Sequence, residues 1–182
     1  MKKGLIIIDV QNDYFKGGNM EVVGMEYAAK NCQLLLKHFR ATHLPIFHVQ
    51  HLSTQKGATF FIPNTIGYEI HESVKPQENE TVIIKNYPSS FRDTGLNEEL
   101  QKTEVTELVV CGAMSHLCVD TTVRAAFDLG YSCKVISDAC ATRNLEFEGK
   151  IINSSDVHAS FMASLKVAFA TVLSTQEFLK IT

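Results

Sequence analysis

Three side chains that could act together in a covalent reaction lie at comparable places in the sequence. Asp9 ends the apolar run "LIII", Lys85 ends "VIIK", and Cys118 follows the run "LVVCGA" where a helical pattern begins. A thiol at a helix N-terminus is favoured as thiolate by the dipole and the free N–H groups, and a nearby ammonium favours it further. A carboxylate within reach can take the thiol proton and later activate water. These residue types predict attack of sulfur on a carbonyl carbon.

Each of these residues also has a purely structural interpretation. A cysteine among apolar residues is most often inert packing, Asp9 could cap a turn, and Lys85 could be a solvated surface lysine. Packing is the preferred interpretation for four cysteines: Cys32, Cys111, Cys133 and Cys140. For Cys118 both interpretations stay open, because it lies where a helix is expected to start. Three such residues at three strand ends are harder to attribute to chance than one.

The elements that would position these residues alternate between strand and helix. Continuous apolar strands suit a sheet buried on both faces, and the alternation predicts parallel strands with right-handed crossovers and helices on both sides. Ligands of such sheets bind beyond the carboxyl ends of the strands. Strands are predicted at 3–10, 44–50, 80–85, 106–113, 131–137 and 171–175. Helices are predicted at 25–43, 94–103 (capped by Thr94), 118–130 and 154–170.

Length and composition predict one globular domain over residues 1–182, with 45% hydrophobic and 20% charged residues. A net charge of −3 without charged blocks argues against nucleic acid or a membrane surface as partner. No apolar run approaches about 18 residues, so we expect a soluble, cytoplasmic protein. Five cysteines without a CxxC pair argue against a disulfide framework or a zinc knuckle. The first strand is not followed by GxGxxG, so a dinucleotide cofactor is not predicted.

Longer motifs extend over nearly the whole chain: "IIIDVQNDY", "KNYPSSF", and "CGAMSHLCVDTTVRAAFDLGY" followed by "VISDACAT". In these motifs the chain resembles the isochorismatase-like cysteine hydrolase superfamily, which includes nicotinamidases and N-carbamoylsarcosine amidohydrolases. The resemblance implies a catalytic triad of Asp9, Lys85 and Cys118. It implies a non-proline cis peptide at Ala113–Met114 and an oxyanion hole made by the N–H groups of Met114 and Cys118.

The implied fold is a Rossmann-like, three-layer α/β/α arrangement whose six-stranded parallel sheet has the order 3-2-1-4-5-6. This order separates the third strand from the first by one intervening strand. Lys85 must therefore reach Asp9 with its long side chain, or the chain must bend after "VIIK". The sequence leaves these two possibilities open.

Nicotinamidases of the superfamily hold a metal through an aspartate and histidines after the second strand. The corresponding segment here, "IFHVQHLSTQ", contains no Asp-x-His. His48 and His51 are three residues apart, so in an extended strand they point to opposite faces. We therefore expect one structural histidine and one loop histidine, and we predict no metal and no other cofactor.

The segment 51–80 is long for a strand-to-helix connection, and such segments are often lids or binding loops. Its aromatic residues Phe60, Phe61 and Tyr68 could cover an apolar pocket or pack at a subunit contact. The resemblance implies a homo-oligomer, a dimer or tetramer, with this region near a neighbour's site. Both interpretations of the segment are kept.

Four side chains are candidate substrate contacts: Phe15, Phe60, Phe91 and His116. Phe91 is a candidate pocket wall because it follows Lys85 within "KNYPSSF". His116 could be mistaken for the base of Cys118, but the resemblance gives that role to Asp9.

Polar residues outside the triad have structural assignments. Asn12 and Asp13 are expected to brace the turn after the first strand, with Asn12 also a possible substrate contact. Arg124 is expected to form an ion pair with Asp138.

Retention of Cys118 favours hydrolysis at an acyl centre, because members that hydrolyse isochorismate, a vinyl ether, do not need the cysteine. We predict a metal-independent hydrolase of a C–N bond in a small amide or N-carbamoyl compound, acting through a thioester on Cys118. A vinyl-ether hydrolase and a catalytically idle ligand-binding member stay open as alternatives. A thiol-redox role is disfavoured, because no resolving cysteine lies at short spacing.

Overall fold

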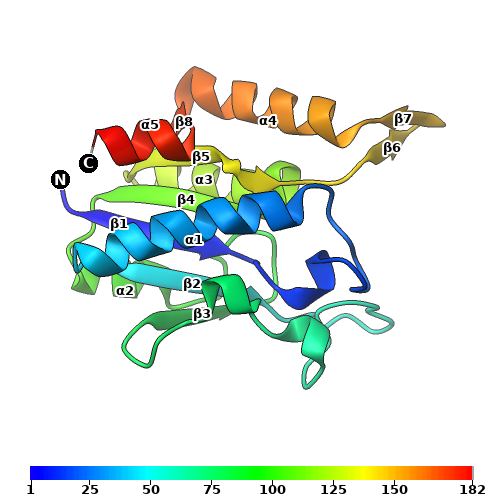
Figure 1. The fold of residues 1–182 in the computed structure, drawn as a ribbon, viewed down its shortest axis with the longest axis horizontal. Coiled ribbons are helices and arrows are strands. Elements are labelled where there is room, and N and C mark those ends of the chain that lie inside the picture. Colours follow the sequence, from blue (N-terminus) through cyan, green and yellow to red (C-terminus); the bar gives the residue numbers. More distant parts are fainter. Residues whose placement is uncertain (182) are drawn as a thin grey trace.

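A six-stranded parallel sheet lies between two layers of helices in the computed structural model, which describes residues 1–181 (Figure 1). The strands follow the order β3-β2-β1-β4-β5-β8, which confirms the predicted order with β8 as its sixth strand. They are β1 (Lys3–Ile8), β2 (Ile46–His51), β3 (Thr81–Lys85), β4 (Glu107–Ala113), β5 (Ser132–Ala141) and β8 (Thr171–Leu173). The order reverses between β1 and β4, which are neighbours, so their carboxyl ends form the switch point where such sheets bind ligands.

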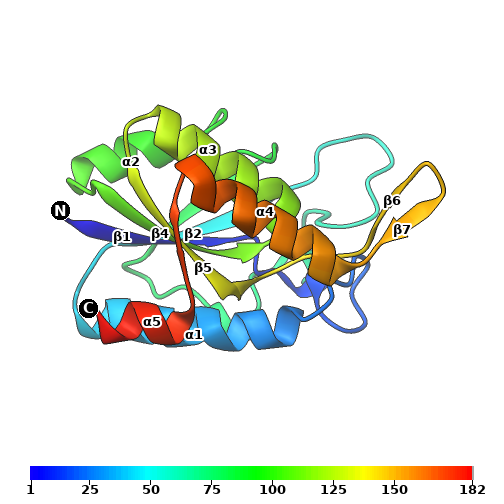
Figure 2. The ribbon, with the colours of Figure 1, turned by 90° about the horizontal axis from the view of Figure 1, so that it is seen from above.

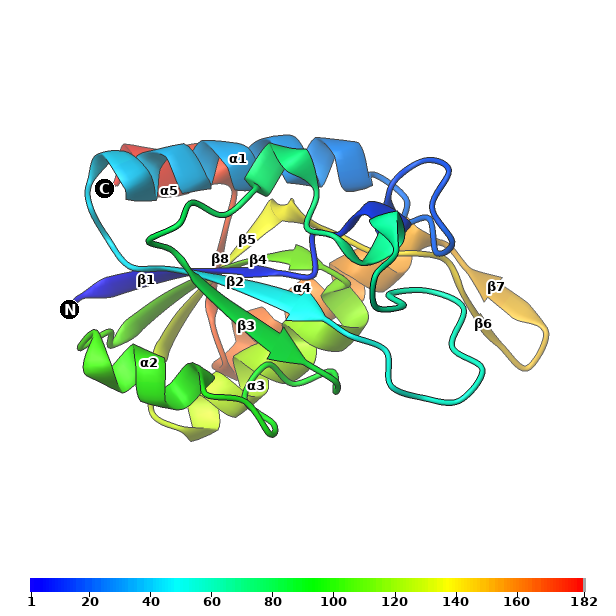
Figure 3. The ribbon, with the colours of Figure 1, turned by 90° about the horizontal axis from the view of Figure 1, so that it is seen from below.

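Helices cover both faces of this sheet. Figures 2 and 3 show α1 and α5 on one face and α2, α3 and α4 on the other. They are α1 (Met25–Ala41), α2 (Leu96–Lys102), α3 (Asp120–Asp128), α4 (Ser154–Ala168) and α5 (Thr175–Lys180). The apolar strand β1 serves both layers, since Leu5 and Ile7 pack on the α1 side while Ile6 and Ile8 pack on the other. Among residues 1–181 no helix has the length and apolarity needed to cross a membrane.

Local signals explain where two of the helices begin and end. Gly130 follows α3 with a φ of 90°, the left-handed conformation that glycine adopts at little cost after a helix. Gly95, not Thr94, holds the position before the first residue of α2. The Thr94 hydroxyl still accepts a bond from the N–H of Leu96 at 3.4 Å, so it contributes to the cap that the sequence predicts.

One hairpin was not predicted from the sequence. Strands β6 (Leu145–Phe147) and β7 (Lys150–Ile152) pair antiparallel and project from the body, as Figure 2 shows. Glu148 and Gly149 join them, and both have positive φ angles, of 50° and 75°. A two-residue turn of this kind is usually announced by Asn-Gly or Asp-Gly. Glu-Gly is a weaker signal, which is why the hairpin was missed.

A partly buried charged cluster ties α1 to the amino end of β3. The Glu80 carboxylate accepts bonds from Arg40 at 2.7 and 2.8 Å and contacts His48 Nε2 at 2.8 Å. Burial alone would raise the pKa of Glu80, but the bonds from Arg40, the Gln77 N–H and His48 outweigh it and lower that pKa to about 2. His48 is thereby a structural histidine, as expected.

This cluster predicts a specific acid sensitivity. The folded-state pKa of Glu80 is depressed, so its stabilisation is complete above the unfolded pKa and is lost as pH falls from about 4.5 toward 2. Glu80→Gln should lower the free energy of unfolding at pH 7 by about 2 kcal/mol, and by much less near pH 3. Urea unfolding at both pH values measures this. Glu72→Gln, which breaks an exposed pair with Lys75, is the control and should change little. An equal loss from Glu80→Gln at both pH values would contradict the assignment.

Candidate active site

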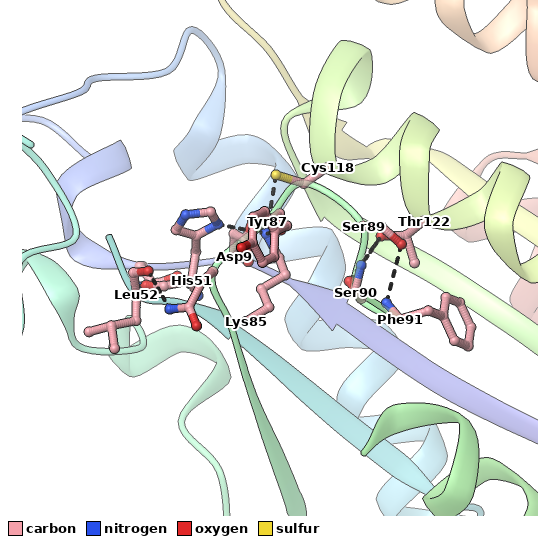
Figure 4. A network of polar contacts seen from close by, with 12 residues as sticks. Asp9, His51, Leu52, Lys85, Tyr87, Ser89, Ser90, Phe91, Cys118 and Thr122 are labelled. Atoms are coloured by element: carbon pink, nitrogen blue, oxygen red, sulfur yellow. Dashed lines mark hydrogen bonds and ion pairs between the residues drawn. The ribbon is translucent and has the colours of Figure 1, made fainter. Parts of the chain in front are cut away.

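Asp9, Lys85 and Cys118 meet at the carboxyl end of the sheet. The Lys85 ammonium lies 2.8 Å from Asp9 Oδ2 and 3.3 Å from the Cys118 sulfur (Figure 4). Asp9 and Lys85 have no exposed surface, and Cys118 is 2% exposed. Strand β2 separates the strands that carry Lys85 and Asp9, so the long lysine side chain crosses it. Of the two possibilities that the sequence left open, it is therefore the long side chain that spans the distance between β3 and β1.

The Lys85 ammonium has two further partners, one of them a histidine. Nζ lies 2.8 Å from His51 Nδ1 and donates to the Tyr87 carbonyl at 3.1 Å. His51 is the last residue of β2 and is paired in register with Lys85 on β3. The expectation of a loop histidine was therefore wrong at this position. The signal that could have found it is that β2 ends at the same sheet edge as β1 and β3.

Gln11 holds the backbone of His51 in place and was also missed. Its side-chain oxygen accepts the His51 N–H at 2.7 Å, and its amide nitrogen donates to the His51 carbonyl at 3.0 Å. The same nitrogen donates to the Tyr68 carbonyl at 2.7 Å. Gln11 is fully buried, so these bonds fix its side chain and, through it, the end of β2.

The surroundings of Cys118 favour its protonated form. Burial first, and then the charge of Asp9, raise the pKa of Cys118 to about 12, although the Lys85 ammonium acts in the opposite direction. Lys85 thus favours the thiolate, as expected, but burial and the Asp9 charge outweigh it. Burial lowers the pKa of His51 to about 4, helped by the Lys85 charge, so this ring is neutral. Burial also opposes the charge of Lys85, but Asp9 and Cys118 outweigh it and raise the pKa of the ammonium.

The segment that carries Cys118 is irregular. Ala113–Met114 is a cis peptide, and a turn of π-helix, Ser115–Val119, precedes α3. Gly112, with a φ of 119°, lets β4 approach β1, since a Cβ there would lie 2.0 Å from the Ile8 carbonyl oxygen. Ser115 anchors the turn through bonds to the Ala141 carbonyl at 3.2 Å and to His158 Nδ1 at 2.8 Å. Cys118 thus lies within this turn, two residues before the first residue of α3.

Two of the four candidate substrate contacts lie in aromatic clusters. The Phe15 ring stacks on His71, with centroids 3.6 Å apart. Phe60 contacts Phe61 and Tyr14, with centroids 5.1 and 6.5 Å away. Tyr14 was not singled out from the sequence. Burial, followed by the charges of Cys118 and Asp9, raises the pKa of this tyrosine well above its usual value, which reflects its closeness to the site.

The other two candidates have different surroundings. The Phe91 ring stacks on Tyr131 at 6.2 Å between centroids, and in Figure 4 it points away from Cys118. His116 Nδ1 is hydrogen-bonded to the Thr142 hydroxyl, and its ring meets Phe161 edge-on. Neither arrangement places a ring against the thiol.

The turn after β1 is braced as predicted, and Arg124 forms an ion pair as predicted, but the predicted partner, Asp138, is wrong. Asp13 accepts the Phe61 N–H at 2.6 Å, and Asn12 donates to the Ile66 carbonyl at 2.8 Å. Arg124 instead pairs with Asp120, four residues earlier on the same helix, at 2.9 Å. Asp138 accepts bonds at 2.7 and 2.8 Å from the N–H and hydroxyl of the residue that starts α5, Thr175. An (i, i+4) pair on one helix needs no distant partner.

Comparison with known proteins places this chain in a family. The isochorismatase domain matches residues 3–177. An uncharacterized isochorismatase family protein of Bacillus subtilis, YddQ, is 54% identical over 99% of this chain and 100% of its own length. The crystal structure of a putative isochorismatase hydrolase from Oleispira antarctica superposes with a TM-score of 0.95 at 45% identity, covering 98% and 96% of the two chains. The chain belongs to the isochorismatase family.

An enzyme with a named substrate is among the relatives. A streptothricin hydrolase of Streptomyces noursei is 33% identical over 79% of this chain and 51% of its own length. Hydrolysis is therefore the class of reaction that the family supports.

The raised pKa of the thiol predicts how Cys118 responds to loss of its neighbour. Asp9→Asn removes a negative charge that opposes thiolate formation, so the pKa of Cys118 should fall. Alkylation of Cys118 by iodoacetamide at neutral pH should then be about tenfold faster than in the wild type. Peptide mapping after brief labelling measures the rate. Cys133, whose pKa burial alone raises to about 12, is the internal control. Unchanged or slower labelling of Cys118 in the variant would count against this electrostatic assignment.

Proposed function

We propose that this protein hydrolyses a C–N bond in a small amide or N-carbamoyl compound through a thioester on Cys118. One observation carries the proposal: a single buried ammonium, that of Lys85, touches both the Asp9 carboxylate and the Cys118 sulfur. A thiol, a base and a fixed positive charge are the groups that acyl transfer to sulfur requires. The streptothricin hydrolase among the relatives is consistent with hydrolysis of this kind.

In the proposed first half-reaction, sulfur attacks the carbonyl carbon while Asp9 takes the thiol proton. The tetrahedral oxyanion binds to the N–H groups of Met114 and Cys118. Asp9 then returns the proton to the leaving nitrogen as the C–N bond breaks, and ammonia or an amine departs. In the second half-reaction, Asp9 takes a proton from water, which attacks the thioester. The acid product leaves, and Cys118 regains its proton.

The protonated resting thiol fits this sequence. Since the pKa of Cys118 lies near 12, the sulfur keeps its proton until the carbonyl is in place, and Asp9 is the adjacent acceptor. When Asp9 becomes neutral, its attraction for the Lys85 ammonium falls. Lys85 can then direct a hydrogen to the sulfur and stabilise developing thiolate charge without leaving its position.

Two alternatives predict different chemistry at the same site. A vinyl-ether hydrolase acting on isochorismate would not require a covalent bond to Cys118, and an idle ligand-binding member would show no turnover. Burial of a reactive constellation of thiol, carboxylate and ammonium favours the enzyme over the idle binder, because buried charges cost stability unless they serve a purpose.

Substitution of the nucleophile separates these possibilities. A panel of small amides and ureido acids would first be screened for release of ammonia. Cys118→Ala should then lower kcat by at least about 10³-fold while ligand binding stays largely intact, and Asp9→Asn should cost nearly as much. Rapidly quenched wild type should carry an acyl adduct on Cys118, visible by mass spectrometry. Amidase turnover undiminished in Cys118→Ala would refute the mechanism. Turnover of isochorismate without an adduct would support the vinyl-ether alternative.

Metal independence is a separate expectation. Asp9 activates the nucleophile directly and Lys85 supplies the positive charge, so no step requires a metal ion. Turnover of any substrate found should therefore survive dialysis against a chelator within error. Loss of turnover on chelation, restored by added zinc or manganese, would falsify this expectation.

A further inference from the structure

Three side chains at the site form a set of metal-type donors. One ligand atom each from Asp9, His51 and Cys118 lies within 4.8 Å of the other two. An oxygen, an imidazole nitrogen and a sulfur are together the donors that zinc takes in proteins. They come from the ends of β1 and β2 and from the turn after β4, so the sheet itself brings them together.

The Lys85 ammonium already contacts this donor set. Its nitrogen lies 2.8 Å from Asp9, 2.8 Å from His51 and 3.3 Å from Cys118, and all three contacts are to potential ligand atoms. Donors around a tetrahedral zinc lie roughly 3.5 Å apart, given bonds of about 2.0 to 2.3 Å. Withdrawal of the Lys85 nitrogen and a contraction of the donors by about 1 Å would therefore convert the ammonium site into a metal site.

We propose that this constellation binds one thiophilic divalent cation of the zinc class, in competition with the protons of Lys85 and Cys118. Binding releases two protons: the thiol becomes a thiolate ligand, and Lys85 becomes a neutral amine that withdraws from the position taken by the cation. The exchange conserves charge. Asp9 and the Lys85 ammonium sum to zero before binding, and Zn²⁺ with the Asp9 carboxylate and the Cys118 thiolate sums to zero after it. A buried site tolerates such a neutral exchange far better than a change in net charge.

The imidazole is held for this role by its backbone. Gln11 binds both the N–H and the carbonyl of His51, so the end of β2 cannot shift away from the other donors. Partners that fix the position of a ligand in this way commonly change metal affinity 10- to 100-fold. The site is thus preorganised on strands rather than on a flexible loop.

The bound cation would inhibit the proposed hydrolysis, because it occupies the base and the nucleophile together. The binding proposal itself does not rest on the proposed function. It concerns affinity for Zn²⁺ alone, without substrate, so its failure is distinguishable from failure of the hydrolase mechanism. It also agrees with metal-independent turnover, since Lys85 holds the position in the working enzyme.

The test is a titration of the metal-free full chain with Zn²⁺ against a chromophoric chelator. Wild type should bind one zinc per chain at this site. Cys118→Ala and His51→Phe should each weaken that binding at least tenfold. Lys85→Met, which removes the competing ammonium, should tighten it at least tenfold. Cys133→Ala removes a buried thiol that is absent from the donor set, so it is the matched control and should bind as wild type does.

Two further measurements cover variants that fold poorly. Co²⁺ bound to wild type should show thiolate-to-cobalt charge-transfer absorption, which Cys118→Ala should abolish. Zn²⁺ should raise the Tm of Lys85→Gln more than that of wild type, since binding to the native state alone stabilises it. Equal zinc affinity in wild type and Cys118→Ala, or no gain in either Lys85 variant, would overturn the proposal.

Discussion

The charge of Lys85 is the constraint around which the site is built, since its side chain has no exposed surface. Removing one partner from a buried ion pair typically costs about 3–5 kcal/mol, because the other charge is left uncompensated. Asp9 supplies the opposite charge, and His51 and the Tyr87 carbonyl accept further hydrogen bonds. The ammonium also donates to the Cys118 sulfur at 3.3 Å, which favours the thiolate. Burial of the sulfur and the charge of Asp9 outweigh this hydrogen bond and raise the pKa of the thiol.

One short stretch after β1 supplies most of what this arrangement needs. Asp9 pairs with the ammonium, and Gln11 fixes the backbone of His51. Asn12 and Asp13 hold the segment that follows β2, through the Ile66 carbonyl and the Phe61 N–H. A side chain on Gly67 would collide with the Asp13 carboxylate, since its Cβ would lie 2.1 Å from Oδ1. The motif "DVQND" is therefore the carboxylate that pairs with Lys85, followed by three anchors for the segments around it.

The sequence predicted the sheet, and it predicted that Asp9, Lys85 and Cys118 lie at one edge of it, because both predictions depend on strong local signals. Apolar strands such as β1 and β4 end at polar or irregular residues, and the strand order places those ends together. His51 and Gln11 were missed because their roles depend on contacts across strands, which no local pattern records. The state of the thiol was also beyond the sequence. A helix N-terminus and a lysine argue for thiolate, but burial and the neighbouring carboxylate, which only the fold reveals, prevail.

Histidine spacing misled the assignment of His51, the last residue of β2. Opposite faces were correctly inferred for residues three apart, since His48 meets Glu80 while His51 meets Lys85. The inference failed at its next step. A histidine on the opposite face from His48 need not lie in a loop away from the site. Strand β3 follows β2 in register and turns Lys85 toward His51, so a histidine that cannot chelate with its neighbour can still join donors from β1 and β4. A ligand set in a parallel sheet is therefore defined by the shared edge of its strands rather than by spacing along any one of them.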